Sequence, residues 1–255
     1  MYFETQENGN RGRLSTEFLP MTHTNWPNDI QMVNATKVDE GLYGSAAFSG
    51  RGLHHFAKRS FDIVAAGSAL LVLSPLLLII CLLVMMDGGP AVFGHKRVGR
   101  NGRSFHCLKF RSMVPNSAEV LAKLLAEDPE AARIWATTRK LQNDPRVTRI
   151  GKFLRGTSLD ELPQLLNVVR GEMSLVGPRP VVQEELDQHY GVAAASYMAV
   201  RPGITGLWQI SGRSDTTYVE RVQLDCRYVR EFSFWGDMRI LLKTVPAVLF
   251  GRGAY

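Results

Sequence analysis

Two adjacent acidic residues, Asp160 and Glu161, have the types and spacing for chemistry on a phosphoryl group. They follow Ser158 in the segment TSLDELPQLLN, residues 157–167, which has the pattern of a helix start. The positive end of a helix keeps a carboxylate ionised and offers amide groups to an anion, so Asp160 could attack or coordinate phosphorus. The same residues also fit a local interpretation, in which Ser158 and Glu161 form a capping box and Asp160 complements the helix dipole.

Basic residues on loops and β-prone segments accompany this acidic pair along the chain. Pro178 and Pro180 restrict the backbone of Arg179, so its guanidinium could be aimed at a diphosphate and bind it in a bidentate manner. The other basic candidates are Lys109, Arg111, Arg155 and, after Gly212, Arg213. Each cation alone is typical of a solvated surface, but with two acids and the apolar segment described next they indicate an enzyme that handles phosphates at a bilayer.

The longest apolar run extends from Ile63 to Met86, 24 residues without a charge. This exceeds the roughly 20 residues that a membrane-spanning helix needs, so we expect a membrane segment here. Basic residues lie on both sides of the run, and basic residues favour the cytoplasmic side of a membrane. They are Arg51, Lys58 and Arg59 before it, and Lys96, Arg97, Arg100 and Arg103 after it. A single crossing cannot place both ends in the cytoplasm.

Ser74 and Pro75 interrupt the middle of this run. Proline removes a backbone donor and bends a helix, and the serine hydroxyl can satisfy a carbonyl that the bend leaves free. Each arm of about a dozen residues reaches roughly 18 Å, which is less than the roughly 30 Å hydrocarbon core. We therefore predict a re-entrant helix-break-helix over residues 55–87, and a kinked helix that spans the membrane is the alternative.

The remaining sequence predicts a poorly ordered tail over residues 1–50 and a cytoplasmic catalytic domain over residues 88–255. The tail is rich in Asn, Thr, Ser and Gly and has no hydrophobic period. The domain is predicted to be mainly α-helical with a small β-hairpin, because Asn101-Gly102 separates two β-prone segments. Helices are predicted at 116–127 with an Asn116–Glu119 capping box, from 128 to about 141, and at 149–155, 159–170, 180–190, 216–230 and 236–250. The last helix fits either the membrane interface or the packed core.

The formal net charge of +6 favours anionic partners such as nucleic acid, phosphorylated small molecules or a membrane surface. The sequence lacks the basic stripe with interleaved aromatic residues that single-strand binders use, so we expect no nucleic acid partner. Three widely spaced cysteines indicate neither a disulfide framework nor a CxxC metal site. The first residues show no signal-peptide pattern, and a reducing, cytoplasmic environment is expected.

Several motifs resemble a known family. They are KRSFD at 58–62, the apolar run broken at Ser74-Pro75, KFRSM at 109–113, SLDELPQLLNVVRGEMSLVGPRP at 158–180 and RPGITGLWQISGR at 201–213. Together they resemble the bacterial sugar transferases, which are monotopic polyprenyl-phosphate glycosyl-1-phosphate transferases, over about residues 55–255. Within that family the chain is most similar to the undecaprenyl-phosphate galactose phosphotransferases that begin exopolysaccharide repeat units.

The resemblance implies a monotopic protein at the cytoplasmic face of the bacterial inner membrane. It implies that Asp160 attacks the β-phosphate of a UDP-sugar, that UMP leaves, and that a phosphosugar remains covalently on the carboxylate. Undecaprenyl phosphate would then attack this acyl phosphate and restore the enzyme. Glu161 would act as an acid/base or orienting partner.

The resemblance also implies a set of ligands and the residues that bind them. Mg²⁺ would neutralise the diphosphate, with Asp160 as its contact in the protein. The substrate-binding positions that match the family's motifs are Lys109, Arg155, Arg179 and Arg213, with Asp225 and Asp237 as acidic positions of undefined role. The implied partners are UDP-galactose or UDP-glucose, undecaprenyl phosphate and membrane lipid, and a homo-oligomer remains open.

Other functions fit parts of the same pattern. A homologue specific for UDP-glucose would differ only in a few pocket contacts. A different membrane-bound phosphotransferase would share the apolar segment and the arginines but would need no UDP-sugar. A non-enzymatic basic module that binds anionic lipid would have no use for the paired carboxylates.

Overall fold

The computed structural model describes residues 52–138, 141, 143–211 and 216–250. The chain divides into two units, residues 1–32 and 33–255, and every described residue lies in the second. The predicted tail over residues 1–50 therefore falls outside the described residues. The second unit is mainly helical with two small sheets, as the sequence predicts, although only one of the sheets was expected.

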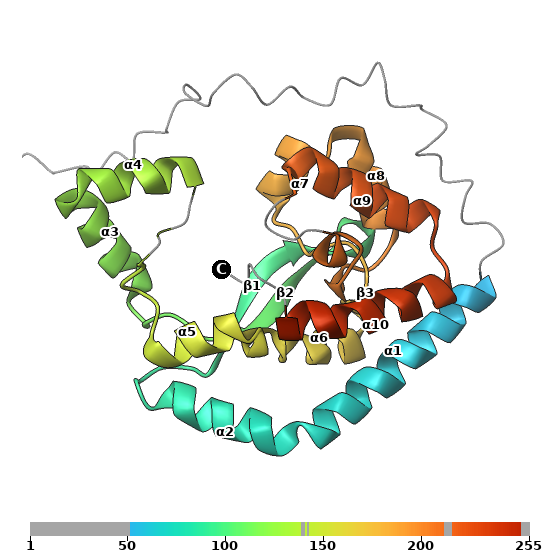
Figure 1. Ribbon diagram of the computed structural model, residues 1–255, viewed down its shortest axis with the longest axis horizontal. Coiled ribbons are helices and arrows are strands. Elements are labelled where there is room, and N and C mark those ends of the chain that lie inside the picture. The colour runs from blue at the N-terminus through green and yellow to red at the C-terminus, as the bar shows by residue number, and fades with distance from the viewer. Residues whose placement is uncertain (1–51, 139–140, 142, 212–215, 251–255) are drawn as a thin grey trace, which may run out of the picture. The chain divides into compact units, whose positions relative to one another are not determined.

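A bent pair of helices forms the lower edge of the molecule in Figure 1. Helix α1 (Gly52–Val72) and helix α2 (Ser74–Met85) are separated by one residue, and their axes are bent by 64°. Pro75 lies in the first turn of α2, where its missing N–H removes no helical hydrogen bond, and the Ser74 hydroxyl donates to the Leu71 carbonyl at 2.7 Å. The structure thus places the bend at Ser74 and Pro75, whereas entry into a membrane stays a prediction.

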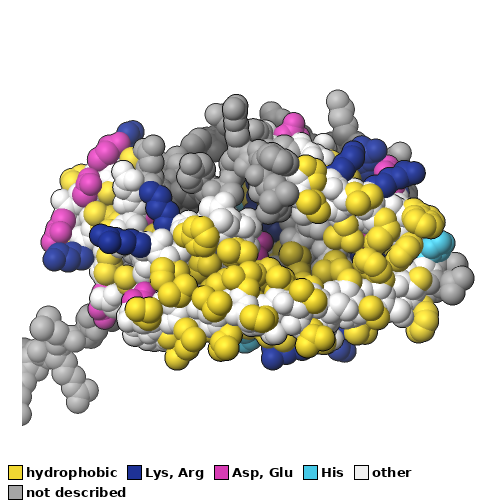
Figure 2. All heavy atoms as spheres, turned by 60° about the horizontal axis from the view of Figure 1, so that its bottom comes forward, with side chains coloured by type: hydrophobic (Ala, Val, Ile, Leu, Met, Phe, Trp, Pro, Cys, Tyr) yellow, Lys and Arg dark blue, Asp and Glu magenta, His cyan; other side chains and the backbone are white. Residues whose placement is uncertain are grey.

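The outer face of the α1–α2 pair exposes many large apolar side chains, which Figure 2 shows as a yellow band. They include Val64, Leu71, Val72, Leu78, Ile79, Leu82 and Met86. No single helix in the described ranges has both the length and the apolar content to cross a bilayer, but the two helices pass that test together.

Next come two strands that form the predicted hairpin. Strands β1 (Val92–Val98) and β2 (Ser104–Phe110) pair in antiparallel register, with Val92 opposite Phe110 and Val98 opposite Ser104. A short turn, η4 (Arg100–Gly102), joins them, and Asn101 and Gly102 both adopt positive φ angles of 57° and 73°. Asn and Gly tolerate this backbone region best, so the Asn-Gly signal confirms the hairpin prediction.

Eight further α-helices and three short 3-10 turns follow the hairpin in the described chain. The helices are α3 (Ser117–Glu127), α4 (Pro129–Thr138), α5 (Arg149–Gly156), α6 (Gln164–Arg170), α7 (Gln183–His189), α8 (Ala194–Ala199), α9 (Tyr218–Arg230) and α10 (Phe234–Phe250), and the turns are η5 (Leu159–Glu161), η6 (Gly191–Ala193) and η7 (Trp208–Ile210). Helix α10 packs against α1, as the packed alternative predicts, and it also exposes Trp235 and Leu242, while a place in the membrane interface stays a prediction.

Two details of the predicted helices differ in the structure. The Asn116 side chain makes no capping hydrogen bond, so the predicted capping box at α3 is wrong. Helix α4 is described as far as Thr138, Leu141 is not helical, and the start of the helix is capped by the Asp128 carboxylate, which accepts from the Glu130 and Ala131 amides.

A second sheet, absent from the sequence predictions, joins two distant loops. Strands β3 (Ser174–Val176) and β4 (Gly203–Thr205) pair in parallel, although the segment around β4 was predicted as a turn-forming loop. The two backbones lie so close that a Cβ atom on Gly177 would collide with the backbone of Arg201, and one on Gly203 would collide with Gly177. Glycine at these positions therefore permits the contact that fixes the Arg179 loop.

Asn167 links β2 to α6 and is completely buried. Its amide nitrogen donates to the His106 carbonyl at 2.8 Å and to Glu172 at 2.6 Å, and its oxygen accepts from the Leu108 amide at 3.0 Å. Two backbone groups of β2 and the Glu172 carboxylate would lose a hydrogen-bond partner without Asn167. The side chain thus holds the strand that carries Lys109 against the helix that follows the acidic pair.

We expect Asn167→Leu to destabilise the protein by about 2–4 kcal/mol, because buried polar groups lose their partners. Thermal or chemical unfolding in detergent micelles measures this loss. Asn116→Leu is the matched control, since Asn116 is exposed and makes no capping bond, and it should change the stability by less than about 0.5 kcal/mol. Equal stability of the two variants would contradict this role of Asn167.

Candidate active site

The acidic pair lies in the 3-10 turn η5, between α5 and α6. Ser158, just before this turn, adopts the left-handed conformation with φ 58° and ψ 15°, and its side chain makes no capping hydrogen bond. An N-cap residue needs an extended backbone, so the predicted capping box of Ser158 and Glu161 is wrong. Helix α6 begins only at Gln164, and the single helix predicted over 159–170 is divided into two elements.

Lys109 holds the two carboxylates together from the neighbouring strand β2. Its Nζ lies 2.5 Å from Glu161 Oε1 and 3.8 Å from Asp160 Oδ2. Asp160 is buried, at 9% exposure, whereas the Glu161 side chain is 38% exposed. The structure therefore contains one sheltered carboxylate and one more accessible carboxylate that share a single ammonium group.

The electrostatic setting of Asp160 differs from the one expected at a helix start. Burial raises the pKa of its carboxyl group, the positive charges of Lys109 and Arg155 act to lower this pKa, and the negative charge of Glu161 adds to the rise. Lys109, rather than a helix dipole, is the main feature that favours the ionised form. A desolvated carboxylate beside one cation is a group that gains from bonding to an electrophile.

Arg155 reaches the same region from the last turn of α5. Its Nε donates to the Ser112 hydroxyl at 2.8 Å, and the guanidinium is exposed to solvent. Because its charge acts on Asp160, the structure brings together Lys109, Arg155 and the acidic pair. Arg111, another basic candidate, is instead buried and binds the Val84, Pro90 and Met113 carbonyls and Asp87, which secures the turn after α2.

Arg179 follows β3, and its charge acts on a residue of β2 that the charges of Lys109 and Glu161 also affect. Burial raises the pKa of the Cys107 thiol on β2 to about 11, and the charges of Lys109, Glu161 and Arg179 all act on this thiol. These three charges therefore lie near enough to Cys107 to act on the same part of the strand. The Arg179 guanidinium lies over the Trp208 ring, 5.2 Å from its centroid.

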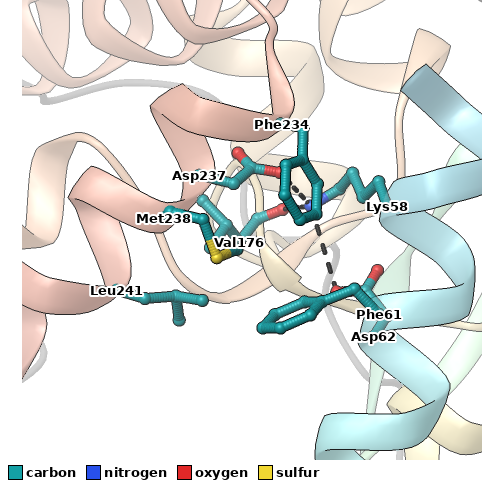
Figure 3. Close-up of a pocket in the computed structure, with 8 residues that line it drawn as sticks. All are labelled: Lys58, Phe61, Asp62, Val176, Phe234, Asp237, Met238 and Leu241. Carbon is teal, nitrogen blue, oxygen red and sulfur yellow. Dashed lines mark hydrogen bonds and ion pairs between the residues drawn. The ribbon is translucent and has the colours of Figure 1, made fainter.

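Asp237 lies in a different cluster, shown in Figure 3. Its carboxylate lies 2.5 Å from Lys58 Nζ, and this ion pair joins α10 to α1. The carboxylate also accepts a hydrogen bond from the Tyr228 hydroxyl at 3.0 Å. Lys58 also donates to the Val176 carbonyl of β3 at 3.0 Å. The structure thus gives Asp237 a partner on α1 and does not place it with Asp160, and its role in substrate binding stays a prediction.

Asp225 is also buried and separate from the acidic pair. It accepts from the Tyr190 hydroxyl at 2.8 Å, and burial raises the pKa of its carboxyl group to about 7. Arg213 lies outside the described residues, so its predicted contact with phosphate is untested.

Asp62 has a role in the structure that the sequence predictions did not assign. It is buried on α1 and accepts from the Ser174 hydroxyl at 2.8 Å and from the Leu175 amide at 3.2 Å. Lys58 and Asp62 are four residues apart, so they lie on one face of α1. Two charged residues at this spacing, next to a strongly apolar run, are the sequence signal that could have indicated a contact between α1 and the rest of the domain.

The two carboxylates fit a magnesium site in which the protein supplies only some of the ligands and the substrate supplies the others. No group of three or more His, Cys, Asp or Glu side chains with metal-binding geometry occurs among the described residues. Mg²⁺ is commonly held by one or two carboxylates together with phosphate oxygens of a substrate, rather than by a complete protein cage. Asp160 and Glu161 supply such a partial ligand set.

A comparison with known protein families matches residues 53–251 to the family described as bacterial sugar transferase. The chain belongs to this family. The resemblance inferred from the sequence motifs is confirmed, and this sugar transferase carries the buried Asp160, the Lys109 bridge and the Arg179 loop within the matched range.

Named relatives support the assignment. The exopolysaccharide production protein ExoY of Rhizobium meliloti (strain 1021) is 56% identical to the sugar transferase over 200 residues, 78% of this chain and 88% of ExoY. A UDP-galactose-lipid carrier transferase of Erwinia amylovora is 56% identical, and an undecaprenyl-phosphate galactose phosphotransferase of Salmonella typhimurium is 54% identical, each over 78% of this chain. The sugar transferase spans only 42% of the length of these last two relatives.

We expect Asp160→Asn to raise the melting temperature of the sugar transferase near neutral pH, because burial disfavours the ionised carboxylate. Since the folded-state pKa lies above the unfolded value, this cost is largest above the folded pKa and disappears once the pH falls below the unfolded pKa. Thermal denaturation from about pH 4 to about pH 8 should therefore show a gain that shrinks toward acid.

Asp187→Asn is the control for that measurement, because Asp187 is exposed on α7. It should leave the melting temperature nearly unchanged at every pH. A melting temperature of Asp160→Asn at or below the wild-type value throughout the range would show that the buried charge is fully compensated.

Proposed function

We propose that this sugar transferase moves a hexose-1-phosphate, specifically galactose-1-phosphate, from a UDP-sugar to undecaprenyl phosphate, as the first membrane step of exopolysaccharide synthesis. The observation that carries the proposal is the buried Asp160 carboxylate within ion-pair distance of Lys109, in a chain of this family. The names of the Erwinia and Salmonella relatives support galactose and the undecaprenyl acceptor. The name of ExoY supports the exopolysaccharide pathway.

In the first half-reaction, an Asp160 oxygen forms a bond to the β-phosphorus of the donor. The bond between this phosphorus and the bridging oxygen breaks, and UMP leaves with the electron pair. The sugar phosphate is then an acyl phosphate on Asp160. In the second half-reaction, a phosphate oxygen of undecaprenyl phosphate attacks the same phosphorus, and the Asp160 carboxylate is released unchanged.

The surrounding side chains divide the remaining tasks. Lys109 favours the ionised form of Asp160 and offsets negative charge at the reacting phosphorus. Glu161, the more exposed acid, orients Lys109 and is placed to exchange protons with solvent. Arg155 and Arg179 bind the phosphate oxygens of the donor. Bound Mg²⁺, held by Asp160 with Glu161 beside it, would supply further positive charge against the diphosphate.

The exposed apolar face of α1 and α2 supports a membrane location for this chemistry. Side chains such as Val72 and Met86, at 75% and 80% exposure, would be costly in water and are favoured in a bilayer. The 64° bend between the two helices supports entry and exit of the chain on the same side. We infer a re-entrant hairpin whose catalytic domain lies at the cytoplasmic face of the inner membrane, where UDP-sugars are available.

The reaction is tested with purified protein, Mg²⁺, undecaprenyl phosphate and a panel of radiolabelled UDP-sugars. Wild-type protein should release UMP and transfer label from UDP-galactose to the lipid fraction, and chelation of Mg²⁺ should stop this. Asp160→Asn should reduce UMP release by at least about 10³-fold because it removes the nucleophile. Asp187→Asn, remote from the pair, should retain wild-type activity.

Other results of this assay would change the proposal. Transfer from UDP-glucose alone would replace galactose as the sugar. Full activity of Asp160→Asn, or turnover without a labelled adduct on Asp160 after rapid quenching, would remove the covalent step. No UMP release with any donor would reject the function as a whole.

The topology is tested by cysteine labelling in a background without the three native cysteines. His55→Cys and His95→Cys mark the two ends of the helix pair. We expect a membrane-impermeant maleimide to label neither residue in intact spheroplasts and both after permeabilisation. Labelling of one position in intact spheroplasts would indicate a spanning helix instead of a hairpin.

A further inference from the structure

Two guanidinium groups share the ring of Trp208. Arg179, after β3, lies 5.2 Å from the ring centroid, and Arg221, on α9, lies 4.4 Å from it. Trp208 is buried at 6% exposure, and Arg221 also lies 5.3 Å from the ring of Tyr218. The two cations therefore come from elements far apart in the chain and are brought to one place by the indole.

These two arginines have no acidic partner in the described part of the chain. Neither forms an ion pair with any Asp or Glu that the structure describes, and the buried Nε of Arg221 has no hydrogen-bond acceptor there. Asp225 lies one turn further along α9, yet its carboxylate binds Tyr190 and leaves Oδ1 without a partner. An attraction to aromatic rings of about 0.5–2 kcal/mol holds the cations but does not neutralise them.

Arg111 shows what a purely structural arginine looks like in this protein. Its Nε and both terminal nitrogens are bonded, to three carbonyls and to the Asp87 carboxylate, and the residue is buried. Arg221 is only partly buried and makes no such bonds in the described chain. The comparison favours a ligand for Arg221 over a role in packing alone.

The stack is electrostatically continuous with the acidic pair. Arg179 acts on Cys107 together with Lys109 and Glu161, and Arg179 and Arg221 act together on Asp225 and Tyr218. Arg179 and Arg221 therefore lie together at Trp208, and Arg179 also acts on a thiol that Lys109 affects. Like charges so close repel one another, and a multiply charged anion that bridges them relieves the repulsion.

We propose that Arg221 is a phosphate-binding residue of the sugar transferase, held beside Arg179 by Trp208 so that both guanidiniums grip phosphate oxygens of a bound substrate. This inference rests on the proposed function and extends it to a residue that the sequence motifs did not indicate. Phosphate oxygens come from two sources, the donor diphosphate and the phosphate of the lipid acceptor. A planar guanidinium suits either one because it donates two parallel hydrogen bonds.

The test compares Arg221→Gln with Arg227→Gln, since Arg227 is an exposed residue of the same helix that pairs with Glu231. Binding of UDP with Mg²⁺ is measured by titration calorimetry, and KM is measured separately for the UDP-sugar and for undecaprenyl phosphate in nanodiscs. Loss of a charged hydrogen-bond pair should weaken one of these interactions about ten- to hundredfold in Arg221→Gln, and Arg227→Gln should match the wild type.

The pattern of results identifies the source of the phosphate. Weaker UDP binding with a raised KM for the UDP-sugar assigns Arg221 to the donor, and a raised KM for the lipid alone assigns it to the acceptor. Unchanged UDP binding and unchanged KM values overturn the proposal. If Arg221→Gln melts early, Arg221→Lys is measured in the same way and should show a smaller loss, because it keeps the charge without the bidentate geometry.

UDP binding also separates this inference from the proposed function. It requires no turnover, so wild-type protein that binds UDP but releases no UMP would reject the reaction while leaving the role of Arg221 measurable. Wild-type turnover with normal kinetics in Arg221→Gln would reject only the role of Arg221.

Discussion

The contact between the buried Asp160 carboxylate and the Lys109 ammonium is the interaction on which the chemistry proposed for this site depends. Burial favours the protonated acid, and the Lys109 cation, held at a fixed distance, is the largest of the contributions that offset this preference. The fixed distance requires a rigid strand. Asn167 provides it, because two of its hydrogen bonds join β2 to the helix that follows the acidic pair. A loosely held lysine would leave the carboxylate protonated more often and less nucleophilic.

The position of the loop that carries Arg179 depends on a steric constraint, which is the close contact between the backbones of β3 and β4. Gly177 and Gly203 allow two backbones to lie in contact, and the parallel pairing of β3 with β4 follows from that contact. Trp208, five residues after Gly203, then packs beside Arg179. Asn167 thus holds the strand that carries Lys109, and two glycines and Trp208 hold the loop that carries Arg179.

Local signals explain which parts of the fold could be predicted from the sequence. Asn101-Gly102 indicates the hairpin and Pro75 the helix break because a single residue type restricts the backbone at each place. Ser158 was misassigned, since serine before two acids is far more common as an N-cap than in the left-handed conformation that it adopts. The β3–β4 pairing and the Lys58–Asp237 contact join segments that are distant in the chain, and no short-range pattern encodes them. The acidic pair was therefore found from sequence, but the positions of its partners were not.

Lys58 and Asp62 couple the apolar helix pair mechanically to the cationic side of the site. Both side chains belong to α1 and both bind β3, and the loop that carries Arg179 follows this strand directly. The contacts of Lys58 and Asp62 therefore tie the position of the Arg179 loop to that of α1. If α1 lies in a bilayer, the depth of this helix would set the height of the Arg179 guanidinium above the lipid headgroups. The thickness of the host membrane would then help to determine how well a lipid-borne phosphate is aligned for reaction.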